Sequence, residues 1–246
     1  MKKSIFALIL LLLFVGLWAA GDILDISGLN NLGLMTLVGV ALVLAYCYLR
    51  FEESGSDTKI VAVVGTLAAL SVAGRVLFAV IPNVQPSTFI IIVSGYVFGP
   101  MAGFMVGSTT ALVSNIFLGH GPWTLWQMLA WGLAGLASGS LGPKRRLEGR
   151  WKLALYCAAW GFFYGWIVNA YFVLGFVHPL SVRSVVAAYG MGLWFDLFHA
   201  AGNFAFAFLL GPALVTMLRR YRSRFLFESE PARIPEGAET GGSCQI

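Results

Sequence analysis

The sequence contains few charged residues: Asp, Glu, Lys and Arg make up 11% of its 246 residues, whereas 59% are hydrophobic. Its mean hydropathy is +0.82. A water-soluble domain of this length could not cover its surface with so few polar groups, so a soluble domain is excluded. Because a helix needs about 20 residues to cross the bilayer core, the chain has room for about eight crossings and little else.

Signatures of catalysis and metal binding are also missing. The sequence has no His-Glu-x-x-His, no Gly-x-Ser-x-Gly and no Walker loop. Cys47, Cys157 and Cys244 have neither paired nor metal-like spacing, so we expect three free thiols. Asp196 and His199 are two potential metal ligands on one helix, but no third ligand lies at a matching depth. The sequence therefore predicts neither a metal nor another cofactor, and no enzymatic activity.

The basic residues indicate topology rather than nucleic-acid binding, although the formal net charge is +5. They form short clusters at the ends of apolar segments. With a cytoplasmic N-terminus and eight crossings, 14 of the 16 Lys and Arg residues lie inside, Arg183 lies outside and Arg75 lies within a segment. This bias predicts a multi-pass protein of the cell membrane with both termini in the cytoplasm.

Eight apolar segments follow one another along the chain. They run Ile5–Ala20, Leu32–Leu49, Ile60–Ile81, Ser87–Phe98, Met101–Leu118, Thr124–Leu141, Leu153–Leu174 and Ala188–Leu218. Helices are expected, because lipid offers the backbone no hydrogen-bond partners. The first segment is a retained anchor helix or a cleaved signal peptide, and we favour the anchor. The fourth would rise only about 18 Å, so it and the fifth either cross separately or form a re-entrant hairpin.

The last segment carries three polar residues on one helix face. Asp196, His199 and Asn203 are three and four residues apart, and Gly192 leaves room beside them one turn earlier. Ionisable residues within a membrane segment indicate a functional site or a buried structural pair. Asn203 lies deeper, and we expect it to be a packing contact between helices.

Other segments place polar groups at the same predicted depth. Arg75, Asn169 and Asp196 lie about 9, 8 and 12 Å from the outer ends of their segments. Asn115 and Gln127 fall close to the outer ends of theirs, and the inner half offers almost no such groups. This asymmetry predicts a cavity that opens outward. Since Arg75 and Asp196 would each be costly alone, we expect them to pair, either within a ligand site or as a structural contact.

Two predicted outer loops fit such a cavity. Residues 81–86 include two prolines and the amides of Asn83 and Gln85, and residues 119–127 are rich in Gly and Trp. Several tryptophans near this level present flat surfaces or form an interfacial belt: Trp123, Trp126, Trp131, Trp166 and Trp194.

A stripe of small residues marks the third segment. Gly65, Ala69 and Ala73 are spaced four apart, which lets another helix approach closely. The neighbour is either another helix of this chain or a partner protein.

Three pieces of the sequence resemble one known family. They are IPNVQPSTFIIIVSGYVFGP at 81–100, VSNIFLGHGPWTLWQMLAWGLAG at 113–135 and FDLFHAAGN at 195–203. With the segments around them, from Ile60 to Leu218, they resemble the substrate-specific S components of energy-coupling-factor (ECF) vitamin transporters. The loops and the last piece are most similar to subfamilies linked to cobalamin uptake, and the family also carries thiamin, riboflavin, biotin and folate.

The resemblance implies a six-helix bundle, and the two apolar segments before Ile60 lie outside this pattern. The predicted fold class is therefore an all-α integral membrane protein, a six-helix bundle preceded by two extra transmembrane helices. The domains would be 1–58, with the two extra helices and a cytoplasmic linker, 59–224, the substrate-binding domain, and 225–246, a disordered cytoplasmic tail. The resemblance also implies that a membrane scaffold subunit and two ATPases drive transport. Gly65, Ala69 and Ala73 match the stripe with which the family contacts its scaffold.

The sequence thus predicts the binding subunit of a vitamin importer with a site in its outer half. The candidate substrate-binding residues are Arg75, Asn83, Gln85, Asn115, His120, Trp123, Gln127, Asn169, Asp196 and His199. Two alternatives stay open: a self-sufficient secondary transporter of a small polar metabolite, and an intramembrane enzyme using Asp196 and His199.

Overall fold

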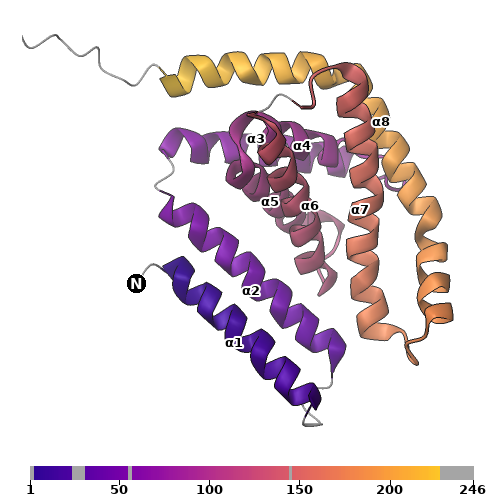
Figure 1. Ribbon diagram of the computed structural model, residues 1–246. Helices are drawn as coiled ribbons and strands as arrows, with labels where there is room; N and C mark the ends of the chain where they lie inside the picture. Colours follow the sequence, from indigo (N-terminus) through magenta and orange to yellow (C-terminus); the bar gives the residue numbers. More distant parts are fainter. Residues whose placement is uncertain (1–2, 24–30, 55–56, 144–145, 228–246) are drawn as a thin grey trace, which may run out of the picture.

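The computed structural model describes residues 3–23, 31–54, 57–143 and 146–227, which form eight helices and no strand. The helices are α1 (Lys3–Ile23), α2 (Leu32–Glu53), α3 (Thr58–Leu77), α4 (Ser87–Phe98), α5 (Pro100–Leu118), α6 (Trp123–Leu141), α7 (Arg150–Phe176) and α8 (Val182–Phe227). They follow the eight apolar segments of the sequence, and the predicted all-α fold class is confirmed (Figure 1).

Within the described ranges, five helices are long and apolar enough to cross a membrane: α2, α3, α5, α7 and α8. The chain is therefore a multi-pass membrane protein. The predicted tail lies outside the described residues from 228 onward, and so does Cys244, whereas 225–227 continue α8. Cys47 and Cys157 are free thiols, as expected.

The short helix α4 lies at the centre of the bundle. It packs against α3, α5, α6, α7 and α8, and every residue from Ser87 to Val97 is buried. Its sequence carries no charge, and protein surrounds it on all sides. A helix of 12 residues can therefore lie inside a membrane protein without exposing its ends to lipid.

Glycines allow α4, α5 and α6 to cross at close range. A Cβ added at Gly103 would lie 2.5 Å from both the Gly135 carbonyl oxygen and the Gly95 Cα. Cβ atoms at Gly95 and Gly135 would likewise overlap the backbone of the facing helix. The three helices therefore meet backbone to backbone, as small residues permit in membrane bundles.

The helix α3 ends earlier than the sequence predicts. It stops at Leu77 rather than Ile81, and the chain continues in tight turns with Ala79 N–H bonded to the Val76 carbonyl at 3.2 Å and Ile81 N–H to the Phe78 carbonyl at 3.1 Å. Ile81 precedes a proline, which disfavours helical backbone there. Arg75 thus lies in the last turn of α3 and not two turns below its end.

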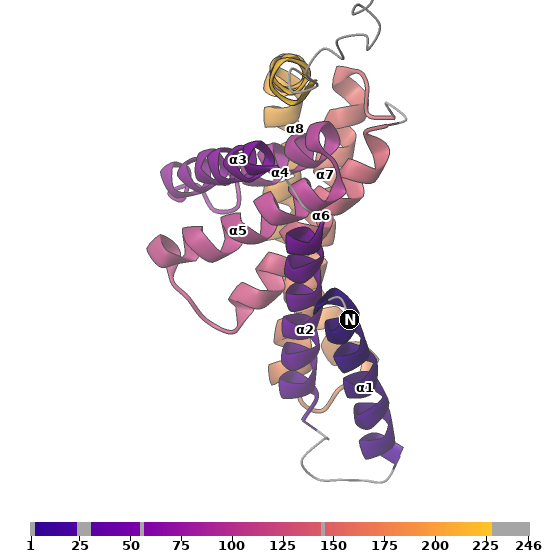
Figure 2. The same ribbon diagram turned by 90° about the vertical axis from the view of Figure 1, so that its left-hand side faces the viewer.

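The hairpin of α1 and α2 lies to one side of the other helices (Figures 1 and 2). Among the described residues, α2 packs against α5, α6 and α7, whereas α1 makes its main contacts with α2. The start of α1 is linked to the end of α2 by an ion pair of 2.7 Å between Lys3 Nζ and Glu52 Oε1. The hairpin therefore covers the bundle face opposite α3.

The 46-residue helix α8 first runs beside α7 and then turns away across the end of the bundle (Figure 1). Pro212 lies inside it and removes one helical hydrogen bond, which accounts for a bend. Beyond the bend, Arg222 Nη1 donates to the Val97 carbonyl at 2.7 Å and Arg219 pairs with Glu148 at 2.9 Å. The last turns of α8 are thus fastened to the C-terminal end of α4.

Candidate functional site

A polar cavity of about 240 Å³ lies among α3, α6, α7, α8 and the loop after α3. Seven of the ten predicted substrate-binding residues line it: Arg75, Asn83, Gln85, Gln127, Asn169, Asp196 and His199. Trp131, Tyr164, Gly165, Val168, Gly192 and Phe195 complete the wall. Polar groups from four helices and one loop therefore converge on a single space, as expected for a small-molecule site.

Arg75 is held by neutral groups on α5 and α6. Its Nη1 donates to the Ser114 hydroxyl and, at 2.7 Å, to Asn115 Oδ1. The guanidinium carbon lies 4.7 Å from the centroid of the Trp131 ring, an attractive cation–π geometry. The expected pairing of Arg75 with Asp196 is wrong: no ion pair joins them, although both line the cavity. The early end of α3 places the guanidinium beside α5 instead.

Aromatic rings connect Arg75 to the opposite wall. The rings of Trp131 and Tyr164 stack with centroids 4.7 Å apart, and Tyr164 meets His199 edge to face at 4.9 Å. Below them, Thr88 Oγ1 accepts a hydrogen bond of 2.8 Å from Trp131 Nε1 and lies 2.8 Å from His199 Nε2. A hydroxyl has one hydrogen and two lone pairs, so Thr88 is a hydrogen-bond partner for both ring systems at once.

Two glycine positions bring polar side chains into the wall between α7 and α8. The Asp196 carboxylate of α8 lies against the Gly165 Cα of α7, where an added Cβ would overlap it. One turn along, Asn169 of α7 lies over Gly192 of α8, whose Cβ would come within 2.5 Å of Nδ2. Since Gly165–Asn169 and Gly192–Asp196 are both four residues apart, the antiparallel helices make room for each other's polar side chain.

The loop after α3 closes one side of the cavity. Asn83 adopts φ +58°, a left-handed conformation that Asn tolerates. Its Nδ2 donates to the Phe195 carbonyl of α8 at 3.2 Å. A Cβ at Gly202 would lie 3.1 Å from the Val84 Cα, so the loop rests closely on α8. Asn83 thereby ties the loop to α8 while it lines the cavity.

Three predicted site residues do not line the cavity. Asn115 is buried behind it, where it bridges Arg75 to Gln127 Oε1, to which its Nδ2 donates at 2.8 Å. His120 is exposed, with its Nδ1 3.5 Å from the Thr124 hydroxyl. Trp123 is 39% exposed at the start of α6. Asn115 therefore positions cavity residues, whereas the other two lie in the loop outside it.

Asn203, expected as a packing contact, is completely buried. Neither of its amide atoms is hydrogen-bonded to a described residue. It lies one helical turn beyond His199, outside the residues that line the cavity.

Tyr164 and Thr88 contact site residues but were not predicted from the sequence. No polar spacing marks them, because Tyr164 lies in an aromatic run and Thr88 in a uniformly apolar helix. One sequence pattern in α7 could have indicated its contact face: Gly161, Gly165 and Asn169 are spaced four residues apart. In the structure, a Cβ added at Gly161 would lie 2.6 Å from the Ala200 Cα of α8. This stripe marks the α7 face that contacts α8.

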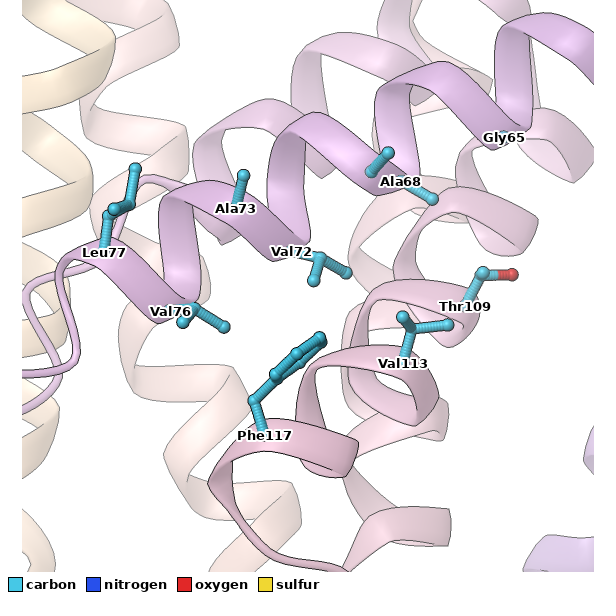
Figure 3. A pocket seen from close by; sticks show the side chains of 10 residues that line it. Gly65, Ala68, Val72, Ala73, Val76, Leu77, Thr109, Val113 and Phe117 are labelled. Atoms are coloured by element: carbon cyan, nitrogen blue, oxygen red, sulfur yellow. The ribbon is translucent and has the colours of Figure 1, made fainter.

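A second, apolar groove of about 580 Å³ lies between α3 and α5 (Figure 3). Gly65, Ala69 and Ala73 line it and are exposed. Val72 of α3 and Phe117 of α5 point into it from opposite sides (Figure 3). The small-residue stripe of α3 is therefore not used for packing within the described chain.

The bundle and its polar cavity define a membrane protein that binds a small molecule. Among the described residues, no group of three or more His, Cys, Asp or Glu side chains could hold a metal ion. Residues 55–220 match the family described as ECF-type riboflavin transporter, S component. The chain belongs to this family and is a substrate-binding subunit of an ECF transporter. No solved structure matches the chain.

Proposed function

We propose that the protein captures a small vitamin or vitamin precursor from outside the cell in the cavity of about 240 Å³. The observation that carries this proposal is the convergence of Arg75, Asn169 and Asp196 on one cavity. Isolated polar groups at such positions are costly, and a polar ligand offsets that cost by hydrogen bonding to them. The exposed His120 and Trp123 would act in the outer loops rather than in the cavity.

The cavity volume favours a ligand smaller than an entire corrinoid. Pockets for drug-sized ligands span about 300–1,000 Å³, whereas this cavity has about 240 Å³. Cobalamin, which the loop resemblance favours, would require the 78–86 loop to move away from α8. A one- or two-ring heterocycle fits a cavity of about 240 Å³ better. Riboflavin, which the family's description names, is intermediate in size between such a heterocycle and cobalamin.

The experiment is identification of the ligand retained through purification by mass spectrometry, followed by affinity measurements. Asp196→Ala and Asn169→Ala should each weaken binding by at least about tenfold, because each removes hydrogen bonds to the ligand. Unchanged affinity in both variants would remove this site assignment. A ligand chemically altered by the protein would instead favour the intramembrane enzyme.

We further propose that the α3 surface binds the scaffold subunit. Gly65, Ala69 and Ala73 are exposed beside a long apolar groove, which suits close approach of a partner helix. Two ATPases would then drive release inward. Uptake by the chain alone in vesicles without ATPases would favour a secondary transporter.

The basic clusters support an orientation with both termini in the cytoplasm and the cavity facing outward. A C-terminal fusion of a reporter that is active only in the cytoplasm should therefore give signal. An inactive fusion, together with activity of the corresponding periplasmic reporter, would contradict this orientation.

A further inference from the structure

We propose that the ligand presents a positively charged or amidine-type N–H edge to Asp196. This inference rests on the proposed function, since it concerns the ligand of the same cavity. Asp196 lines the cavity, yet it is only 4% exposed. Among the described residues, none donates a hydrogen bond to its carboxylate and none forms an ion pair with it.

Among the described residues, none of the donors near Asp196 bonds its carboxylate. Arg75 shares the cavity, but its Nη1 is bound to Ser114 and Asn115. His199 lies one turn along α8 from Asp196, and its Nε2 faces the Thr88 hydroxyl. The hydroxyl of Tyr189 donates to the Trp166 carbonyl at 3.1 Å. The carboxylate is thus left with its acceptor capacity unused.

An ionised carboxylate only accepts hydrogen bonds, and burying one without donors is costly. Gly165 deepens this burial, because the absence of a Cβ lets the carboxylate lie directly against α7. A protein that keeps such a group beside a cavity is complementary to donors that arrive from the cavity. Two N–H groups on nitrogens that share one carbon, as in an amidine, match the two carboxylate oxygens best, and a positive charge strengthens both bonds.

The remainder of the wall defines the other properties of the ligand. Tyr164 and Phe195 contribute aromatic side chains to the wall, which favours a flat ring. Arg75 is not paired with Asp196, so the cavity keeps a positive and a negative group apart. The matching ligand is a small, flat nitrogen heterocycle with donors towards Asp196 and acceptors towards Arg75.

Three probes of the same shape test this preference: benzamidine, benzamide and benzoate, which carry a cationic, a neutral and an anionic group. Their affinities for the purified full-length protein, freed of co-purified ligand, would be measured by ligand-observed NMR. We expect benzamidine to bind about tenfold or more tightly than benzamide, because charged hydrogen bonds are stronger than neutral ones. Benzoate should bind most weakly. Absence of benzamidine binding at 10 mM, taken as a concentration of the order at which such fragments bind, would overturn the inference, as would equal binding of all three.

The variant Asp196→Asn keeps the shape and removes the charge. It should reduce the benzamidine-to-benzamide ratio to about one, and a ratio unchanged from wild type would contradict the inference. The wild-type comparison decides the matter even if this variant does not fold. Failure here is distinguishable from failure of the proposed function: a neutral or anionic retained vitamin that Asp196→Asn binds normally would overturn only the charge preference.

Discussion

The carboxylate of Asp196 on α8 lies against the Cα of Gly165 on α7, in space that the Cβ of any other residue at position 165 would occupy. Asn169 and Gly192 repeat this relationship one turn along, with the two helices exchanging roles. The contact sets both the distance between the helices and the depth of the carboxylate in the cavity. The glycines of α7 and α8 therefore provide the space that the polar side chains of Asp196 and Asn169 occupy between the two helices.

Replacing Gly165 by Ala should displace Asp196 and weaken ligand binding by at least about tenfold, since a charged hydrogen-bonding group leaves its position. Isothermal titration with the retained ligand measures this effect. Gly175→Ala is the matched control on the same helix, because its Cβ would meet nothing within 4 Å. Equal affinity of the two variants would show that the Gly165 contact does not position the carboxylate.

Replacing Thr88 by Val should lower the apparent melting temperature by about 5 °C or more, because Trp131 Nε1 and His199 Nε2 both lose a buried partner. Thermal unfolding followed by size-exclusion chromatography provides the measurement. Thr110→Val is the control: Thr110 is equally buried, but its hydroxyl bonds only to the Val106 carbonyl of its own helix. A loss of the same size in the control would mean that the shared hydroxyl has no special role.

Replacing Gly135 by Ala should destabilise the bundle by about 3 kcal/mol, because the new Cβ would overlap the backbone of α5 at Gly103. The yield of monodisperse protein and its melting temperature report the loss. Gly190→Ala places a Cβ in open space on α8 and should be neutral or slightly stabilising. Similar melting temperatures for both variants would contradict the close crossing of α5 and α6.

Replacing Ala69 by Leu should abolish co-purification with the scaffold subunit and leave ligand affinity within about twofold of wild type. The leucine fills the exposed stripe but lies outside the cavity wall. Ala205→Leu, at an exposed position of α8, controls for added bulk on a lipid-facing surface. Retained assembly of the Ala69 variant would exclude the α3 stripe as the docking surface.

Much of the site could be predicted because its polar residues stand out in apolar sequence. Asp196 and His199 were identified from their spacing on one helix face, and Asn169 from its depth; all three line the cavity. Arg75 was placed correctly in the cavity but assigned the wrong partner, since the early end of α3 directs it to Ser114 and Asn115. His120 and Trp123 lie outside the cavity, because a loop rich in glycine does not fix where its side chains point.

The sequence by itself determined that this is a multi-pass membrane protein with eight helices, because low charge and long apolar segments are local properties that lipid imposes directly. It also placed most of the polar groups at one end of the bundle. Only the tertiary structure decided which of them meet. That choice depends on backbone approach at Gly165, on the burial of α4 that brings Thr88 under His199, and on stacking of Tyr164 against Trp131. These are contacts between distant parts of the chain, and no local spacing encodes them.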